Sequence, residues 1–390
     1  MVLTAITLGL GACLLLVAWT RGLAYQMADN AIRSRLGHVV VEARGYRDDP
    51  DPSLNLPDGG AGVLALLVDA EGVHAAPRLI GDGLVQSARR SVRGVIVGVD
   101  PLREPRVSNV ATSIVEGEYL SPEPVAGRAL PSIVLGRGMA ERLRLGVGDK
   151  LVLHVPGEAG LGAFRIVGLF VTASSEFDRS FVFIRIAEAQ RLLAVAGAAT
   201  EVALTLDRPG RASAVQARLR RALAGQGVEV LRWQERAPRL AVMLNSMDQM
   251  GWIFYAAVFV AMSFGIANAL LMSVFERIRE FGVLRSLGLP GRRLVALVLA
   301  ESTLLTLLGV ALGTGVGGLL VLWLGSSGID LAAFSSALRA YGAGAIMYPR
   351  LGWADLVTPI ELALATALLA GSWPAWRVAR LQPAEALRGR

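Results

Sequence analysis

Four long apolar segments constrain this chain more than any other feature of its sequence. They cover residues 2–19, 251–275, 294–324 and 356–373. Their length and apolar purity suit α-helices that cross the hydrocarbon layer of a membrane, which takes about 20 residues. Hydrophobic residues make up 53% of the chain and charged residues 18%, with a mean hydropathy of +0.51. A soluble domain carries a larger charged share, so we predict an α-helical membrane protein with four transmembrane helices.

The arginines beside these segments predict the orientation of the chain. Between the second and third segments lie Arg277, Arg279, Arg285, Arg292 and Arg293, and after the fourth come Arg377, Arg380, Arg388 and Arg390. The stretch between the third and fourth segments has only Arg339 and Arg350. Because cytoplasmic loops are enriched in Lys and Arg, we expect both termini in the cytoplasm and residues 24–249 outside it.

The first apolar segment has a second interpretation. Residues 10–13, Leu-Gly-Ala-Cys, are similar to a lipid-attachment box, which would make the segment a cleaved signal peptide. However, no basic residue precedes the segment, and it continues past Cys13 to Trp19. We therefore favour a membrane helix in which the only cysteine of the chain is a small apolar residue.

Residues 24–249 have the pattern of a folded α+β domain. Short strand-like runs cover residues 38–42, 92–99, 132–135, 150–155, 164–172, 181–184 and 201–206, and helical spacing covers 137–145, 186–195 and 211–223. Residues 48–62, rich in Asp, Pro and Gly, predict a loop. Residues 232–249 have helical spacing up to the second apolar segment, and Pro238 predicts either a kink or the true start of that stalk helix.

The fold class predicted is therefore a four-helix membrane protein with a large extracytoplasmic α+β domain inserted between the first and second helices. Its parts are a first transmembrane helix (1–23), the external domain with its stalk helix (24–249), a second transmembrane helix (250–275), a cytoplasmic coupling segment (276–293), a third transmembrane helix (294–324), an external loop (325–355), a fourth transmembrane helix (356–374) and a cytoplasmic tail (375–390).

The sequence offers little catalytic chemistry. A phosphate-binding loop needs a lysine followed by Ser or Thr, and the only lysine, Lys150, is followed by leucine. The histidines His38, His74 and His154 are isolated, and the chain has one cysteine, so we expect no metal site. The basic residues are spread along the chain instead of forming a nucleic-acid surface. We predict a non-catalytic membrane subunit without a cofactor of its own.

The segment between the second and third apolar runs is short, charged and patterned. Apolar Ile278, Phe281, Val283, Leu284 and Leu287 recur at helical spacings among charged residues, and Gly288 with Pro290 would end the helix. An amphipathic helix of this kind either lies on the membrane surface or docks in the groove of a partner. The pattern alone does not separate these two possibilities.

Three sequence elements together resemble the FtsX/MacB-type family of ABC transporter permeases. They are the segment 276–288, Ala300-Glu301-Ser302 in the third apolar run, and the tail 373–388 with its Pro-Ala-Glu-Ala-Leu-Arg. The resemblance implies that residues 276–288 form a coupling helix on a separate ABC ATPase dimer, which binds the ATP and magnesium. The docking residues would be Glu276, Arg277, Arg279, Glu280, Leu284, Arg285 and Gly288. It also implies a second permease copy or paralogue, and no central pore for the substrate.

Within that family, three groups of residues are similar to the lipoprotein-releasing (Lol) branch: 37–41, 146–150, and 167–170 with 176–178 and 189–190. That branch usually carries a basic arm before the first helix, whereas Met1 here adjoins the apolar run. The resemblance implies a bacterial inner-membrane protein, a lipoprotein or lipid cargo, and a periplasmic lipoprotein carrier. The candidate contact residues are Glu176, Phe177, Asp178 and Arg179. A MacB-like efflux permease and an FtsX-like scaffold that activates a periplasmic hydrolase are the alternatives.

Two acids, Glu301 and Glu361, lie within the apolar runs. Intramembrane acids are costly and often functional. Both are close to a predicted helix end, where water or lipid headgroups reach them, so we favour a structural or interfacial role over proton relay.

Overall fold

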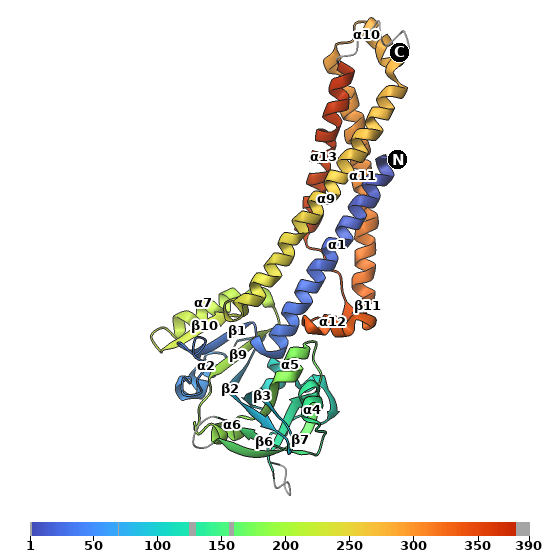
Figure 1. Cartoon of the computed structure of the whole chain (residues 1–390). Helices are drawn as coiled ribbons and strands as arrows, with labels where there is room; N and C mark the ends of the chain where they lie inside the picture. Colours follow the sequence, from blue (N-terminus) through green and yellow to red (C-terminus); the bar gives the residue numbers. More distant parts are fainter. Residues whose placement is uncertain (1, 69, 125–129, 156–159, 380–390) are drawn as a thin grey trace. The chain divides into compact units, whose positions relative to one another are not determined.

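The computed structural model describes residues 2–68, 70–124, 130–155 and 160–379. The chain divides into two compact units. The helical unit comprises Met1–Tyr25, Met243–Leu331 and Ile346–Arg390, and the sheet unit comprises Gln26–Val242 and Ala332–Ala345 (Figure 1).

Four helices of the described chain are long and apolar enough to cross a membrane. The first comprises most of α1 (Val2–Ala31) with the π-helical turn that follows it, and the others lie in α9 (Pro238–Glu276), α11 (Gly291–Ser327) and α13 (Trp353–Ala379). All four helices are longer than their apolar runs. α1 continues past its predicted end at residue 23, and α13 continues into the predicted tail. Pro238 begins α9, because Ala237 has non-helical dihedral angles and separates it from the short α8 (Trp233–Arg236).

The helical unit has an apolar core to which all four long helices contribute. Ile6 and Leu10 of α1, Phe259 of α9, Val310 of α11 and Ala363 of α13 are among its buried members. Cys13 is buried in the same core, as expected of a small apolar residue. Interhelical packing in lipid relies on small residues that let backbones approach.

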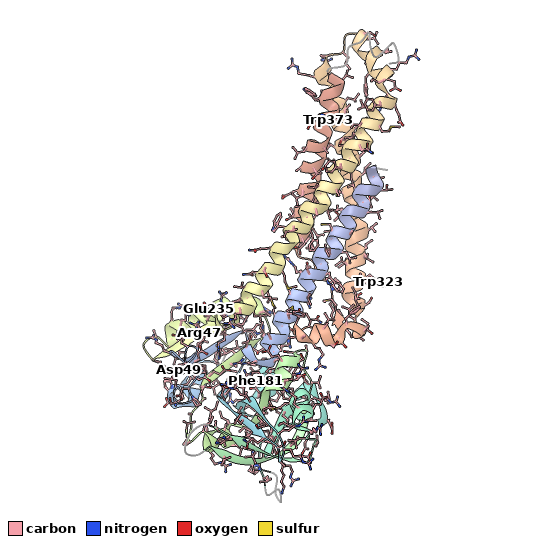
Figure 2. All side chains as sticks on the ribbon, viewed as in Figure 1. Arg47, Asp49, Phe181, Glu235, Trp323 and Trp373 are labelled. Atoms are coloured by element: carbon pink, nitrogen blue, oxygen red, sulfur yellow. The ribbon has the colours of Figure 1, made fainter. Side chains whose placement is uncertain are left out.

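Glycines bring α1 and α11 close together. A Cβ atom added to Gly317 would lie 2.9 Å from the Cα atom of Gly11, and one added to Gly313 would lie 3.0 Å from the Thr7 carbonyl oxygen. Exposed tryptophans lie near the ends of the spans, including Trp323 of α11 and Trp373 of α13, at opposite ends of the helical unit (Figure 2). Tryptophans are enriched at membrane–water interfaces, so these positions fit a membrane-spanning bundle.

The sheet unit is built on a ten-stranded mixed sheet with the order β10-β1-β9-β2-β3-β8-β5-β7-β4, in which β6 pairs with β2 and β7 (Figure 1). The strands are β1 (Val39–Ala43), β2 (Val73–Gln86), β3 (Ser91–Val99), β4 (Ile114–Gly117), β5 (Ser132–Gly136), β6 (Lys150–His154), β7 (Leu161–Phe170), β8 (Phe181–Arg185), β9 (Glu201–Leu206) and β10 (Val228–Arg232). The pairs β3–β8 and β5–β7 are parallel, and the other pairs are antiparallel.

Short helices join and cover these strands. They are α2 (Ala61–Ala65), α3 (Glu104–Val107), α4 (Arg137–Leu143), α5 (Ser175–Ser180), α6 (Ile186–Leu192) and α7 (Ala212–Ala222). The predicted external loop 325–355 contains α12 (Ser335–Ala340) and the small strand pair β11 (Ile329–Asp330) and β12 (Ile346–Met347). Residues Ala332–Ala345 of this loop belong to the sheet unit. The fold class expected from the sequence, four membrane helices with an α+β domain between the first and second, is confirmed.

Three strands of the ten-stranded sheet, β2, β4 and β10, were not predicted from the sequence pattern, and neither was the small pair β11–β12. β2 is the longest strand and pairs with β3, β6 and β9. Its sequence contains Pro77, Gly81 and Gly83, residue types that are depleted in strands, and it bears the charged Arg78 at its centre. Gly83 is needed because an added Cβ atom would lie 2.8 Å from the His154 carbonyl oxygen on β6.

Candidate ATPase-docking site

The predicted coupling helix forms as α10 (Ile278–Ser286), between α9 and α11. α9 ends at Glu276, and Arg277 is the junction residue. At the other end Gly288 has a φ of +92°, and the Leu289 N–H donates to the Leu284 carbonyl oxygen at 3.1 Å. A glycine in the left-handed region stops a helix without side-chain strain, which is the role predicted for Gly288.

One side of α10 packs on its own chain. Phe281 is buried with Val274 of α9, Leu294 and Val298 of α11, and Ala375 of α13. Leu284 is half-buried against the same cluster. These contacts pack α10 against the ends of three long helices, α9, α11 and α13.

The other side of α10, together with the flanking residues Glu276 and Leu287, is open and mixes charge with apolar surface. Glu276, Arg279 and Glu280 are exposed, and so are Val283 (43%) and Leu287 (79%). The apolar residues predicted for this helix therefore fall into two groups. Phe281 and Leu284 face the chain's own core, and Val283 and Leu287 face outward. An outward apolar pair bordered by charges is typical of a protein-binding surface. The side chain of Arg285 lies outside the described set.

Arg277 ties the coupling helix to α11. Its Nε atom donates to the Glu280 Oε2 atom at 2.9 Å, and its Nη1 atom donates to the Glu301 Oε2 atom at 3.4 Å. The carboxylate of Glu280, followed by that of Glu301, raises the pKa of the Arg277 guanidinium. Such exposed pairs contribute little stability. Their effect is to position Arg277 between α10 and α11. The pairing of Glu301 with Arg277 is consistent with an interfacial role for this acid.

The candidate cargo-contact residues lie in α5, which Ser174 caps by accepting a hydrogen bond from the Phe177 N–H at 3.3 Å. Glu176 and Arg179 face solvent, whereas Phe177 and Asp178 are buried. Phe177 stacks on Phe181 with ring centroids 4.3 Å apart. Only Glu176 and Arg179 are therefore placed for direct contact with a partner in this structure.

Asp178 instead anchors neighbouring backbone. Its Oδ1 atom accepts hydrogen bonds from the Thr172 N–H at 2.9 Å and the Thr172 hydroxyl at 2.7 Å. Its Oδ2 atom accepts from Nη2 of Arg339 in α12 at 2.6 Å. Burial raises the pKa of Asp178, while these donors oppose that shift. The Arg339 contact joins two segments far apart in the sequence, and no sequence pattern indicated it.

The described residues contain no group of three or more His, Cys, Asp or Glu side chains that could hold a metal ion. Glu361 is exposed on α13. The tail motif continues beyond α13 into residues 380–390, which lie outside the described residues, so only its first part can be located.

Two family models match almost the whole chain. A MacB-like periplasmic core domain matches residues 1–222, and an FtsX-like permease C-terminal domain matches residues 252–383. The first match covers α1 and nearly all of the sheet unit, and the second covers the other three long helices with α10. This combination of folds and segments is that of an ABC transporter permease.

Two relatives match this chain over nearly its whole length, and one solved domain is similar to part of it. The lipoprotein-releasing system transmembrane protein LolC of Xylella fastidiosa strain Temecula1 is 25% identical over 98% of this chain and 92% of its own length. LolC of Neisseria meningitidis serogroup B is 26% identical over 99% of this chain and 92% of its own length. The solved periplasmic region of MacB from Actinobacillus actinomycetemcomitans has a TM-score of 0.37 and 11% identity over 53% of this chain and 94% of that chain. The chain belongs to the FtsX/MacB-type family of ABC transporter permeases.

Proposed function

We propose that this chain is the permease subunit of a lipoprotein-releasing machine in a bacterial inner membrane. A separate ATPase would dock on α10 and drive the extraction of lipidated cargo from the outer leaflet to a periplasmic carrier. The observation that carries the proposal is the similarity to LolC proteins over 98–99% of this chain. The match to the macrolide export protein MacB of Bdellovibrio bacteriovorus is 31% identical but covers 37% of this chain.

The physical task suits such a machine. Pulling an acyl chain out of lipid costs about 0.8 kcal/mol per CH₂ group, so spontaneous release is slow and an energy source is needed. The exposed charged and apolar side chains of α10 and the residue after it, among them Glu280 and Leu287, support a docking role. ATP and magnesium would be held by the partner, with a second permease copy or paralogue completing the complex.

The test begins with the tagged chain, extracted from its native membrane in mild detergent, and the proteins that co-purify with it. The complex is then reconstituted with an acylated lipoprotein, and release to the soluble phase is measured with ATP. We expect an ABC ATPase in the complex and ATP-dependent release of the acylated cargo only. A hydrolysis-deficient ATPase and a non-acylated cargo are the matched controls.

The two other functions predict different results. An outer-membrane duct in the complex, with ATP-dependent efflux of a soluble compound, would replace lipoprotein release by MacB-like efflux. A co-purifying periplasmic hydrolase, activated by ATP without any cargo release, would identify a signalling scaffold. Absence of any ATPase would contradict all three functions.

A further inference from the structure

The sheet unit contains a network of two arginines and three glutamates, which the backbone carbonyl oxygen of a third arginine joins. Its members are Arg35, Arg78, Arg236, Glu42, Glu104 and Glu201. Arg78 is 1% exposed, and the three glutamates are buried. Long charged side chains are almost never this deeply buried unless they are paired, so the arrangement needs a reason.

Arg78, at the centre of β2, holds one half of the network. Its Nη2 atom lies 2.7 Å from Glu104 Oε1 and its Nε atom 3.1 Å from Glu104 Oε2, which is a two-pronged contact. Its Nη1 atom donates to Glu201 Oε1 at 3.3 Å and also to the carbonyl oxygen of Arg35. The guanidinium therefore has partners on three separate segments.

Arg236 holds the other half. Its Nε atom lies 2.9 Å from Glu42 Oε2 on β1, and its Nη2 atom lies 3.7 Å from Glu201 Oε2. The two carboxylate oxygens of Glu201 thus point to different arginines, Oε1 to Arg78 and Oε2 to Arg236. Glu201 is the group that joins both halves.

The two arginine segments are the places where the chain enters and leaves the sheet. Arg35 lies in the π-helical turn Ile32–Leu36 that directly follows α1, and its guanidinium lies 5.0 Å from the ring centroid of Phe181, which Figure 2 labels. Arg236 is the last residue of α8, and Pro238 begins α9 two positions later. The Trp233 N–H also donates to the His38 carbonyl oxygen at 3.3 Å, which links the two segments directly.

A network of this kind is poorly explained by stability. Replacing a buried ion pair by apolar side chains of similar volume is often neutral or stabilising, whereas removing one partner is strongly destabilising. Hydrogen-bonded ion pairs fix the relative position of the two segments they join, because they are directional. Apolar contacts allow such segments to slide past each other.

We propose that Glu201 is a positioning residue for energy coupling. Through Arg78 and Arg236 it holds the turn after α1 and the helix α8 before α9 in a fixed position relative to each other. A movement of α1 or α9 would then move the whole sheet. The inference rests on the proposed function for its energy source. It adds the joint that converts motion of the two membrane helices into motion of the external domain.

The test uses the full chain in its complex with the co-purified ATPase, in nanodiscs. Cys13 is the only cysteine, so a Cys13→Ala background accepts spin labels at Arg33→Cys and Arg239→Cys, two exposed positions beside the joint. The distribution of distances between the two spin labels is measured by double electron–electron resonance, with and without ATP. The variant is Glu201→Gln, and the matched control is Glu188→Gln, which removes a similarly buried carboxylate of α6 that is paired with Arg185 and Arg191.

We expect a single narrow distribution in both nucleotide states for the unmodified joint and for Glu188→Gln, and a broadened distribution for Glu201→Gln. ATP hydrolysis should continue, while lipoprotein released per ATP falls roughly threefold to tenfold in Glu201→Gln, which is a coupling change of about 0.7 to 1.4 kcal/mol. An unchanged distribution in a folded Glu201→Gln complex would overturn the proposal.

A milder variant guards against loss of folding. At pH 8.5, above the Glu42 pKa of about 7, Glu42→Gln removes the carboxylate partner of Arg236 and leaves the Arg78 half intact, so it should broaden the same distribution to a smaller extent. If Glu201→Gln misfolds, a narrow distribution for Glu42→Gln would overturn the proposal. The distance measurement needs no cargo. A complex that hydrolyses ATP and shows the expected distances, but releases no lipoprotein, would reject the proposed cargo and keep the joint.

Discussion

At the scale of single residues, Glu42 shows how burial links protonation to stability. Its side chain is fully buried on β1, and burial raises its pKa from 4.5 to about 7, although Arg236 opposes the shift and Glu201 and Glu229 reinforce it. Between these two values the folded chain keeps a proton that the unfolded chain has released. The free energy of unfolding should therefore fall as the pH rises from 4.5 to 7, by roughly 3 kcal/mol, and then stay level.

The measurement is the melting temperature of the full chain in detergent from pH 4.5 to 8.5. Glu42→Gln should flatten the decline above pH 5, while Glu188→Gln, at another buried glutamate, should keep it. His38 acts in the opposite sense, because burial lowers its pKa and its share of stability is lost as the pH falls below 6.5. A parent protein and Glu42→Gln variant with identical pH profiles would contradict the assignment.

A second residue-scale prediction concerns Asp178 and Arg339. Arg339→Ala leaves the buried Asp178 carboxylate with Thr172 as its remaining partner. The free energy of unfolding of the sheet unit should fall by about 2 kcal/mol. This is less than the loss expected for a fully buried ion pair, because Arg339 is partly exposed. The Asp178→Asn and Arg339→Ala changes should be less than additive when combined. Denaturant titration of the two single variants and the double variant measures this coupling. If the two changes in unfolding free energy simply add in the double variant, the 2.6 Å contact between Arg339 and Asp178 contributes no stability.

At the scale of elements, α10 combines an inward face that fixes it on the membrane helices with an outward face without a role in the described fold. Leu287→Asp changes a side chain that is 79% exposed, so the melting temperature of the isolated chain should not move. Affinity for the ATPase should fall at least tenfold, which is about 1.4 kcal/mol, because a charge would enter an apolar contact. Glu280→Arg should have the same effect by reversing a charge and breaking the pair with Arg277.

Binding of the purified ATPase to nanodisc-embedded chain measures both changes. Leu161→Asp provides the control, since it alters a similarly exposed leucine in the sheet unit. If Leu287→Asp and Glu280→Arg bind the ATPase as tightly as the parent, α10 is not the docking helix and lies on the membrane surface instead.

The elements also show what the sequence could and could not predict. Seven of the strands and the four spans follow from local periodicity, because each residue there packs according to its own hydropathy. β2 did not, because Pro77, Gly81 and Gly83 fit only against specific neighbours. The buried network was invisible for another reason: Arg78 pairs with residues 26 and 123 positions away, and such partners are set by the fold, not by spacing. The helix Ile278–Ser286 could be predicted because the residues of its pattern are contiguous in the sequence.

At the scale of the whole molecule, the arginine distribution predicts that α10 faces the cytoplasm and the sheet unit faces the other side. Thiol labelling can test the prediction, because Cys13 is the only native cysteine and is buried in the core of the helical unit. Ser286→Cys places a thiol at the end of α10, and Ala222→Cys places one at the end of α7, both at exposed positions.

A membrane-impermeant maleimide applied to intact spheroplasts should label Ala222→Cys and leave Ser286→Cys unmodified, and inside-out vesicles should reverse the two results. The parent chain should remain unlabelled in both preparations. The five arginines between the second and third apolar segments would otherwise have to lie on the outer side, against the bias that orients membrane proteins. Labelling of Ser286→Cys in spheroplasts would place α10 where no ATPase can reach it, and would remove the physical basis for energy coupling through this helix.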